Sequence, residues 1–122
     1  ALPISPGGKN IYPEEIESFF GNSPVISEIL ITGRKVSATD AGEEILAVVY
    51  ADRERLKGFY PEAELTEDFL NRLVRQEISS VNKRLTTYQK ISDYILRPEE
   101  FEKTASGKIK RFLYREYSKP KS

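Results

Sequence analysis

Apolar residues recur every three or four positions between Phe69 and Leu85, and this periodicity constrains the fold more than any other feature of the chain. The stripe consists of Phe69, Leu70, Leu73, Val74, Ile78, Val81 and Leu85. Such spacing places the apolar side chains on one face of a helix. Thr66 is a suitable N-cap, and Leu65 and Leu70 are spaced to form a hydrophobic staple across it. We therefore expect a helix that begins near Thr66 and packs this stripe into the core.

Three further segments predict a small sheet. Residues 25–31 and 44–51 are aliphatic and β-branched, and they have the length of strands. The polar residues 32–43 contain two glycines and predict a loop that joins these strands as a hairpin. A third strand is expected at residues 88–96, before Arg97-Pro98. These elements predict an α+β fold with an antiparallel or mixed sheet of about three strands flanked by helices.

Two shorter helices are expected near the ends of the chain. The segment 12–15 (Tyr-Pro-Glu-Glu) is typical of a helix start, because proline suits the first turn and acidic residues suit its positive end. The apolar side of this helix would be formed by Ile16, Phe19 and Phe20. Gly21-Asn22 is a usual helix end. Residues 3–10 predict a loop or tight hairpin, and residues 112–117 a second short helix.

Composition limits the chemistry that the chain can perform. The 122 residues suit one domain, and 39% hydrophobic with 31% charged residues is typical of a globular protein. The chain contains no cysteine and no histidine, which excludes disulfides, thiolate sites, histidine-ligated metals and Ser-His-Asp chemistry. No apolar run approaches the roughly 20 residues of a membrane span. Any catalysis therefore uses Lys, Asp, Glu, Tyr, Ser, Arg or backbone groups, and a cytoplasmic location is expected.

The net charge of zero conceals an asymmetry. From Lys103 to Ser122 there are seven basic residues and one acidic residue, so this segment carries +6 and the rest of the chain −6. A basic tail suggests an anionic partner such as phosphate or nucleotide, whereas the plainer interpretation is a solvated tail. Tyr114 and Tyr117 among these charges suggest base stacking, with core packing as the alternative. A free-standing module that binds an anion or nucleic acid is thus one hypothesis.

A glycine–lysine pair lies inside this basic segment, at residues 104–111 (Thr-Ala-Ser-Gly-Lys-Ile-Lys-Arg). Gly107 allows the backbone to turn tightly and to project Lys108 outward. A flexible ammonium on such a loop suits the neutralisation of phosphate or carboxylate oxygens as charge builds during a reaction. The alternative is an ordinary surface lysine.

A second glycine–lysine element, Gly7-Gly8-Lys9-Asn10, leads into the helix start at residues 12–17. Neither element has the spacing of a phosphate-binding P-loop, and the Rossmann fingerprint is absent. Gly8 would otherwise be a turn glycine, and Lys9 and Asn10 solvated loop residues. The acidic residues that follow are better explained as helix-start charges than as general bases. They are Glu14, Glu15 and Glu17.

Together the two elements resemble the C-terminal domain of the acyl-adenylate-forming (AMP-binding) enzymes, a group that includes acyl-CoA synthetases and peptide-synthetase adenylation domains. Residues 7–17 (Gly-Gly-Lys-Asn-Ile-Tyr-Pro-Glu-Glu-Ile-Glu) match the glycine-loop motif that follows the hinge of this family. Residues 104–111 match its terminal lysine motif. The first motif is most similar to that of long-chain fatty acyl-CoA synthetases. In one departure, Glu102 stands where the family usually has proline.

The resemblance implies a ligase reaction in two steps, with ATP, CoA and Mg²⁺ as cofactors. A carboxylic acid, here a fatty acid, first forms an acyl-adenylate, and the thiol of CoA then displaces AMP to give a thioester. Lys108 would be the catalytic lysine of the first step. The residues that support its loop would be Thr104, Ser106 and Gly107. The loop along the pantetheine path in the second step would consist of Gly7, Gly8, Lys9 and Asn10.

The resemblance also implies what the chain lacks. Residues 1–122 would form the mobile C-terminal domain, and an N-terminal adenylation domain, absent from this chain, would bind ATP, Mg²⁺ and the carboxylic acid. The isolated domain is expected to be inactive, to hold no metal and to bind no nucleic acid. It has no transmembrane segment, although the rest of the protein could associate with a membrane. An enzyme that loads a carrier protein instead of CoA is the alternative within the family.

Overall fold

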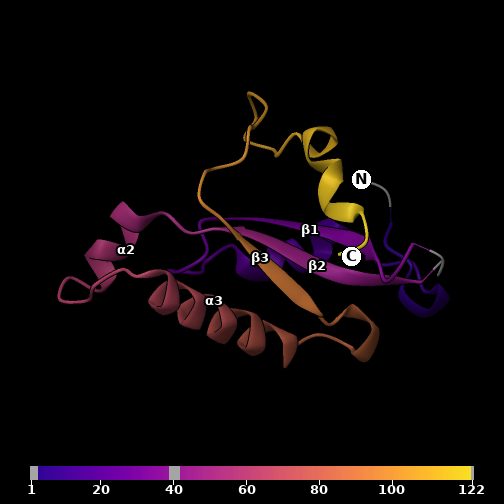
Figure 1. The fold of residues 1–122 in the computed structure, drawn as a ribbon, viewed down its shortest axis with the longest axis horizontal. Coiled ribbons are helices and arrows are strands. Elements are labelled where there is room, and N and C mark those ends of the chain that lie inside the picture. The colour runs from indigo at the N-terminus through magenta and orange to yellow at the C-terminus, as the bar shows by residue number, and fades with distance from the viewer. Residues whose placement is uncertain (1–2, 39–41, 122) are drawn as a thin grey trace.

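The computed structural model describes residues 3–38 and 42–121, and its centre is a mixed sheet of three strands (Figure 1). The strands are β1 (Glu28–Lys35), β2 (Glu43–Tyr50) and β3 (Asp93–Arg97), in that order across the sheet. β1 and β2 are antiparallel, with Glu28 opposite Tyr50. β2 and β3 are parallel, with Leu46 opposite Asp93. The predicted α+β class, with a mixed sheet of three strands, is therefore confirmed.

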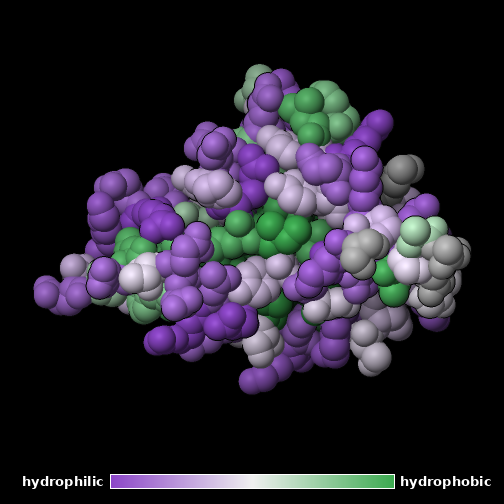
Figure 2. Space-filling view, viewed as in Figure 1, coloured by the Kyte–Doolittle hydropathy of each residue, from purple (hydrophilic) through white to green (hydrophobic). Residues whose placement is uncertain are grey.

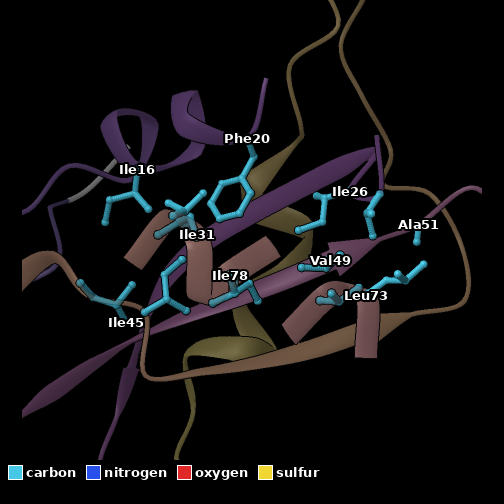
Figure 3. Close-up of a cluster of buried hydrophobic side chains, with 14 of the residues drawn as sticks. Ile16, Phe20, Ile26, Ile31, Ile45, Val49, Ala51, Leu73 and Ile78 are labelled. Carbon is cyan, nitrogen blue, oxygen red and sulfur yellow. The ribbon is translucent and has the colours of Figure 1, made fainter. Parts of the chain in front are cut away.

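One face of the sheet is covered by α3 (Glu67–Asn82), the helix that the apolar periodicity predicted. Thr66 is its N-cap, because the Thr66 side chain accepts a hydrogen bond from the amide of Phe69 at 3.1 Å. The buried side of α3 consists of Leu70, Leu73, Val74, Ile78 and Val81. These residues pack with inward-facing strand residues, such as Ile31, Ile45 and Val49, into the larger core cluster (Figure 3).

The first helix also forms, as α1 (Pro13–Glu17) followed by the 3₁₀ turn η2 (Ser18–Phe20). Ile16 and Phe20 enter the same core cluster as α3 (Figure 3). Gly21, however, has φ −58°, so this helix does not end in a left-handed glycine as Gly21-Asn22 predicted. The chain instead turns through Ser23, whose hydroxyl accepts hydrogen bonds from the amides of Val25 and Ile26.

Two strand predictions are wrong in their boundaries. The strand predicted at residues 25–31 begins at Glu28 and continues to Lys35, so it occupies part of the predicted loop 32–43; residues 39–41 of that loop lie outside the described residues. The strand predicted at 88–96 is β3, which begins only at Asp93. Before it, the chain forms the 3₁₀ turn η3 (Thr87–Gln89), because Thr86 and Gln89 form a capping box.

The short helix α2 (Arg53–Phe59) was not predicted. Its N-cap is Asp52, whose side chain accepts a hydrogen bond from the amide of Glu54 at 3.0 Å. Leu56 is its one buried residue, so α2 offers no apolar periodicity that the sequence could display.

The opposite face of the sheet is covered by the C-terminal 3₁₀ segment η4 (Arg111–Ser118), drawn in yellow in Figure 1. It includes the helix predicted at residues 112–117, in 3₁₀ rather than α form. Tyr114 contacts the buried Phe101 edge-on, with ring centroids 5.0 Å apart, and Tyr117 accepts a hydrogen bond from Arg97 at 3.0 Å. Both tyrosines pack onto the second core cluster, so core packing, rather than base stacking, accounts for them.

Arg34 connects all three strands at one end of the sheet. Its guanidinium, nearly buried, binds Glu44 of β2 and donates to Asp93 of β3 at 2.9 Å. Burial acts to raise the pKa of Asp93, but the hydrogen bonds from Arg34 and from the amide of Tyr94 outweigh it, so this pKa lies below its ordinary value. The parallel strand β3 is thereby fixed to both other strands.

Candidate functional site

The predicted lysine loop is a tight hairpin that projects away from the sheet (orange in Figure 1). The amide of Thr104 donates to the carbonyl of Lys108 at 2.7 Å, and the amide of Gly107 donates to the carbonyl of Thr104 at 2.9 Å. Gly107 has φ +87°, a left-handed conformation that favours glycine. The hydroxyl of Thr104 accepts from the amide of Lys108 at 3.2 Å and lies 3.1 Å from that of Ser106. The three predicted support residues therefore shape the turn that presents Lys108.

Lys108 is exposed and forms no ion pair with the residues that the structure describes. Four other cations of the basic tail are paired within the chain: Lys103 with Glu28, Lys110 with Glu102, Arg111 with Glu17 and Lys121 with Asp93. Lys108 is thus free to bind an external anion, whereas much of the positive charge counted in the sequence is paired with carboxylates of the same chain.

The first leg of the hairpin is attached to the body through Glu28 and through Tyr114. On the first leg, Glu28 binds both the amide of Phe101 at 2.8 Å and the ammonium of Lys103 at 2.6 Å. The hydrogen bond to Glu28 raises the pKa of Lys103, which keeps this ammonium charged. The amide of Glu102 donates to the Tyr114 hydroxyl at 2.7 Å. Glu28 and Tyr114 had no local signal in the sequence, because they lie 75 and 12 residues from their partners.

The predicted glycine loop forms a second, smaller hairpin. Ile4 and Ile11 exchange two backbone hydrogen bonds of 2.7 Å and so close the loop. Within it, the 3₁₀ turn η1 (Pro6–Gly8) contains Gly7 at φ +60° and Gly8 at φ +81°. A Cβ atom at either glycine would meet nothing within 4 Å. Glycine is favoured here by the backbone conformation, and the surrounding space is open to a ligand.

Lys9 and Asn10 lie on this loop and are exposed. The Lys9 ammonium lies 5.3 Å from the centroid of the Tyr88 ring, a cation–π distance. The Asn10 side chain lies 3.4 Å from the Ser5 hydroxyl. Tyr88 was expected in a strand; it instead borders the glycine loop from η3.

The two loops lie apart. In Figure 1 the lysine hairpin rises on the side of η4, away from the indigo segment that carries the glycine loop. The ends of the two motifs are nevertheless linked, because Glu17 binds Arg111 at 2.5 Å and accepts from the amide of Ile31 at 2.8 Å. Burial raises the pKa of Glu17, although Arg111 and Ile31 partly offset this effect. Glu17 therefore holds the motifs on one body, and its ion pair leaves it poorly suited to act as a general base.

Neither loop has a nucleotide pocket of its own. A hollow of about 410 Å³ lies between β1 and η4, but neither Lys108 nor Gly8 lines it. Within residues 3–38 and 42–121, no group of three or more His, Cys, Asp or Glu residues is placed to hold a metal ion. The described helices are too short or too polar to cross a bilayer.

Hydrophobic surface lies beside the lysine hairpin. Figure 2 shows it over η4, the element that exposes Phe112 and Leu113. Phe112 retains 61% of its accessible surface. Two adjacent exposed apolar residues on one element suit a surface that contacts another protein domain.

No protein-family model matches the chain. The chain is 36% identical over 110 residues to the mitochondrial medium-chain acyl-CoA ligase of Bos taurus, a match that covers 90% of this chain and 15% of the relative. A fatty acyl-CoA synthetase from Mycobacterium tuberculosis has a similar structure, with TM-score 0.64 and 30% identity over 97% of this chain and 20% of that one. The structure of an ATP-bound RpMatB-BxBclM chimera is also similar, with TM-score 0.66 and 25% identity, and the match covers 93% of this chain and 20% of the chimera. The chain thus spans a fifth or less of these relatives, and its predicted resemblance to part of the acyl-CoA ligases is confirmed.

Proposed function

We propose that this chain is the mobile C-terminal domain of an ATP-dependent acyl-CoA ligase. The observation that carries the proposal is Lys108, an ammonium on an ordered hairpin with no ion pair to a described residue, in a chain that is similar to a fifth or less of such ligases. The open surroundings of both loops support a domain that completes a site formed largely by another domain. Lys108 is the one catalytic group proposed here, and the hollows found among the described residues are lined neither by Lys108 nor by Gly8, so we expect the isolated domain to be inactive.

In the first step, Lys108 would act by charge neutralisation and orientation. A carboxylate oxygen of the substrate attacks the α-phosphorus of ATP, and the bond to pyrophosphate breaks, which leaves an acyl-adenylate. The Lys108 ammonium would bind the attacking carboxylate and an α-phosphate oxygen together, which holds them in reacting geometry and stabilises the developing charge. Residues that hold Mg²⁺ would lie in the N-terminal domain, because no acidic cluster within residues 3–38 and 42–121 is placed to hold it.

In the second step, the glycine loop would replace the lysine hairpin at the site. The CoA thiolate attacks the acyl carbon, the bond to AMP breaks and a thioester forms. Since the two loops lie on different sides of the domain, a rotation of the whole domain would exchange them. The backbone at Gly7 and Gly8 would then border the pantetheine arm, where open space and missing side chains leave room for it.

The substrate is proposed to be a fatty acid. The motif predicts a long-chain acid, whereas the Bos taurus relative is named for medium chains, so a test needs both lengths. CoA is the proposed acceptor, and a carrier protein is the alternative. Nucleic-acid binding by the tail is disfavoured, because Tyr114 and Tyr117 pack on the core and four of its cations are paired. A cytoplasmic location remains a prediction.

The test measures the two half-reactions separately in the full-length protein, with fatty acids of several lengths. Lys108→Ala is expected to slow acyl-adenylate formation by about 10²- to 10³-fold, because one transition-state charge contact is lost. The same variant should still convert supplied acyl-adenylate to thioester. Lys119→Ala, another exposed tail lysine with no ion pair to a described residue, is the matched control.

The glycine loop predicts the opposite pattern. Gly8→Leu should spare adenylation and slow thioester formation, because a side chain enters the acceptor path. Gly58→Leu, on α2 at the far end of the molecule, is its control, since a Cβ there also meets nothing within 4 Å. Equal losses in both half-reactions for Lys108→Ala and for Gly8→Leu would contradict the proposed division of roles.

A further inference from the structure

We infer that Glu28 is a positioning residue for Lys108, because it fixes the first leg of the lysine hairpin (residues 101–104) to the edge of the sheet. The inference deepens the proposed function and rests on it. Glu28 is the first residue of β1 and belongs to neither glycine–lysine motif. It acts through the hairpin and does not itself approach the reacting atoms.

One carboxylate holds two points of the leg at once. Its Oε1 atom accepts from the amide of Phe101 at 2.8 Å, and its Oε2 atom accepts from the Lys103 ammonium at 2.6 Å. The same ammonium donates to the carbonyl of Phe101 at 2.8 Å, which closes a ring of contacts. The Glu28 side chain is only 18% exposed, so these charge-assisted hydrogen bonds are partly shielded from water.

The rest of the hairpin depends on this base for its direction. Residues 104–108 are all exposed, and the hydrogen bonds that shape this turn run among these five residues. The second leg is joined to the first, since Lys110 donates its amide to the carbonyl of Glu102 at 2.9 Å and pairs with the Glu102 carboxylate at 3.2 Å. The Glu102 side chain, at a position where the family usually has proline, therefore stiffens the hairpin across its base, while its amide joins the hairpin to Tyr114 of η4.

The geometry converts a small loosening at the base into a large displacement of the lysine. The Lys108 backbone lies opposite Thr104, about one residue beyond the Lys103–Ile109 bridge, and its long side chain carries the ammonium to roughly 10 Å from Lys103. A tilt of about 10° at the base would then move the ammonium by roughly 2 Å, and a displacement of 1 Å can cost a reaction about 100-fold. Burial of Phe101, packing of Ile109 on the second core cluster and the hydrogen bond from the Glu102 amide to Tyr114 also anchor the hairpin. Glu28 adds a partly buried, charge-assisted contact at two points of the first leg, which restrains this tilt further.

The first test is made on the 122-residue chain by NMR. In Glu28→Ala, the backbone heteronuclear NOE of residues 104–109 should fall while that of β2 stays unchanged. Glu28→Gln should lie between this variant and wild type, because the amide oxygen still accepts from Phe101. Lys103→Met removes only the ammonium and gives a second route if Glu28→Ala fails to fold.

The second test measures the half-reactions in the full-length protein. Glu28→Ala should slow acyl-adenylate formation by about tenfold or more and change thioester formation from supplied acyl-adenylate by less than about twofold. Glu44→Gln is the matched control, because it weakens another partly buried ion pair about 20 Å away along β1. It should affect the two half-reactions alike.

The outcomes distinguish the role of Glu28 from the proposed function of the chain. Unchanged hairpin NOEs, or equal losses in both half-reactions for Glu28→Ala, would overturn the role of Glu28. If Lys108→Ala does not impair adenylation, the proposed function is wrong, while the NMR result still reports whether Glu28 orders the hairpin.

Discussion

The glycine of the lysine hairpin offers a test of how the backbone conformation supports the site. Gly107 has φ +87°, and a Cβ atom added there would meet nothing within 4 Å. Gly58 of α2 also has open space around its Cβ position, but its φ lies outside the left-handed range. The same change to alanine at the two positions therefore isolates the backbone conformation from steric contact.

The expected effects have opposite signs. Alanine at Gly107 must adopt a left-handed conformation, which costs about 1–2 kcal/mol. Alanine at Gly58 removes conformational freedom from the unfolded chain and suits a helix, which stabilises by about 0.5–1 kcal/mol. For a domain of this size, 1 kcal/mol corresponds to a change in Tm of about 4 °C. Gly107→Ala should therefore lower Tm by roughly 4–8 °C, and Gly58→Ala should raise it by roughly 2–4 °C.

Thermal unfolding of the chain followed by circular dichroism measures both shifts. Gly107→Asn is a useful third variant, because asparagine tolerates the left-handed conformation and should be less destabilised than alanine. In the full-length protein, Gly107→Ala should also slow adenylation more than thioester formation. Shifts of equal sign for Gly107→Ala and Gly58→Ala would refute the assignment of the effect to backbone conformation.

Three further predictions concern the packing and charges that support the site. Phe101→Ala should lower the free energy of unfolding by about 3–5 kcal/mol in urea titration, because this fully buried ring would leave a cavity under the hairpin. Thr66→Ala should lower it by about 1 kcal/mol through loss of the N-cap, measured in the same way. The third prediction concerns the free energy of unfolding measured as a function of pH. Because the pKa of Asp93 is lowered in the folded state, its contribution is present above the ordinary pKa of 3.8 and is lost as the pH falls through the folded pKa. Asp93→Asn should therefore reduce the loss of stability at acidic pH. The pKa of Glu17 is raised in the folded state, so its contribution to the free energy of unfolding is present below the ordinary pKa of 4.5 and is lost as the pH rises through the folded pKa. Glu17→Gln should therefore change the slope of stability against pH in the sense opposite to Asp93→Asn. Changes of the same sign in the two variants would contradict both assignments.

Local patterns in the sequence were sufficient to predict those elements whose structure depends on residues close together along the chain. The apolar period that predicted α3 reflects a helix with one buried face, and Thr66 caps it through an amide three residues away. Both glycine–lysine elements are tight turns whose hydrogen bonds lie within a few residues. Their order and spacing were enough to predict the resemblance to part of the acyl-CoA ligases.

Only the tertiary structure decided which groups hold these turns in place. Glu28 lies 75 residues from Lys103, and Glu17 lies 94 residues from Arg111, so neither pair has a local signal. The same holds for the parallel pairing of β3 with β2, which Arg34 secures across the sheet. Short-range hydrogen bonds and periodic burial are encoded by adjacent residues, whereas a partly buried carboxylate acquires its partner only when the fold brings a distant cation to it. The sequence therefore predicted Lys108 as the reactive group, and the fold showed which distant residues contact the hairpin that carries it.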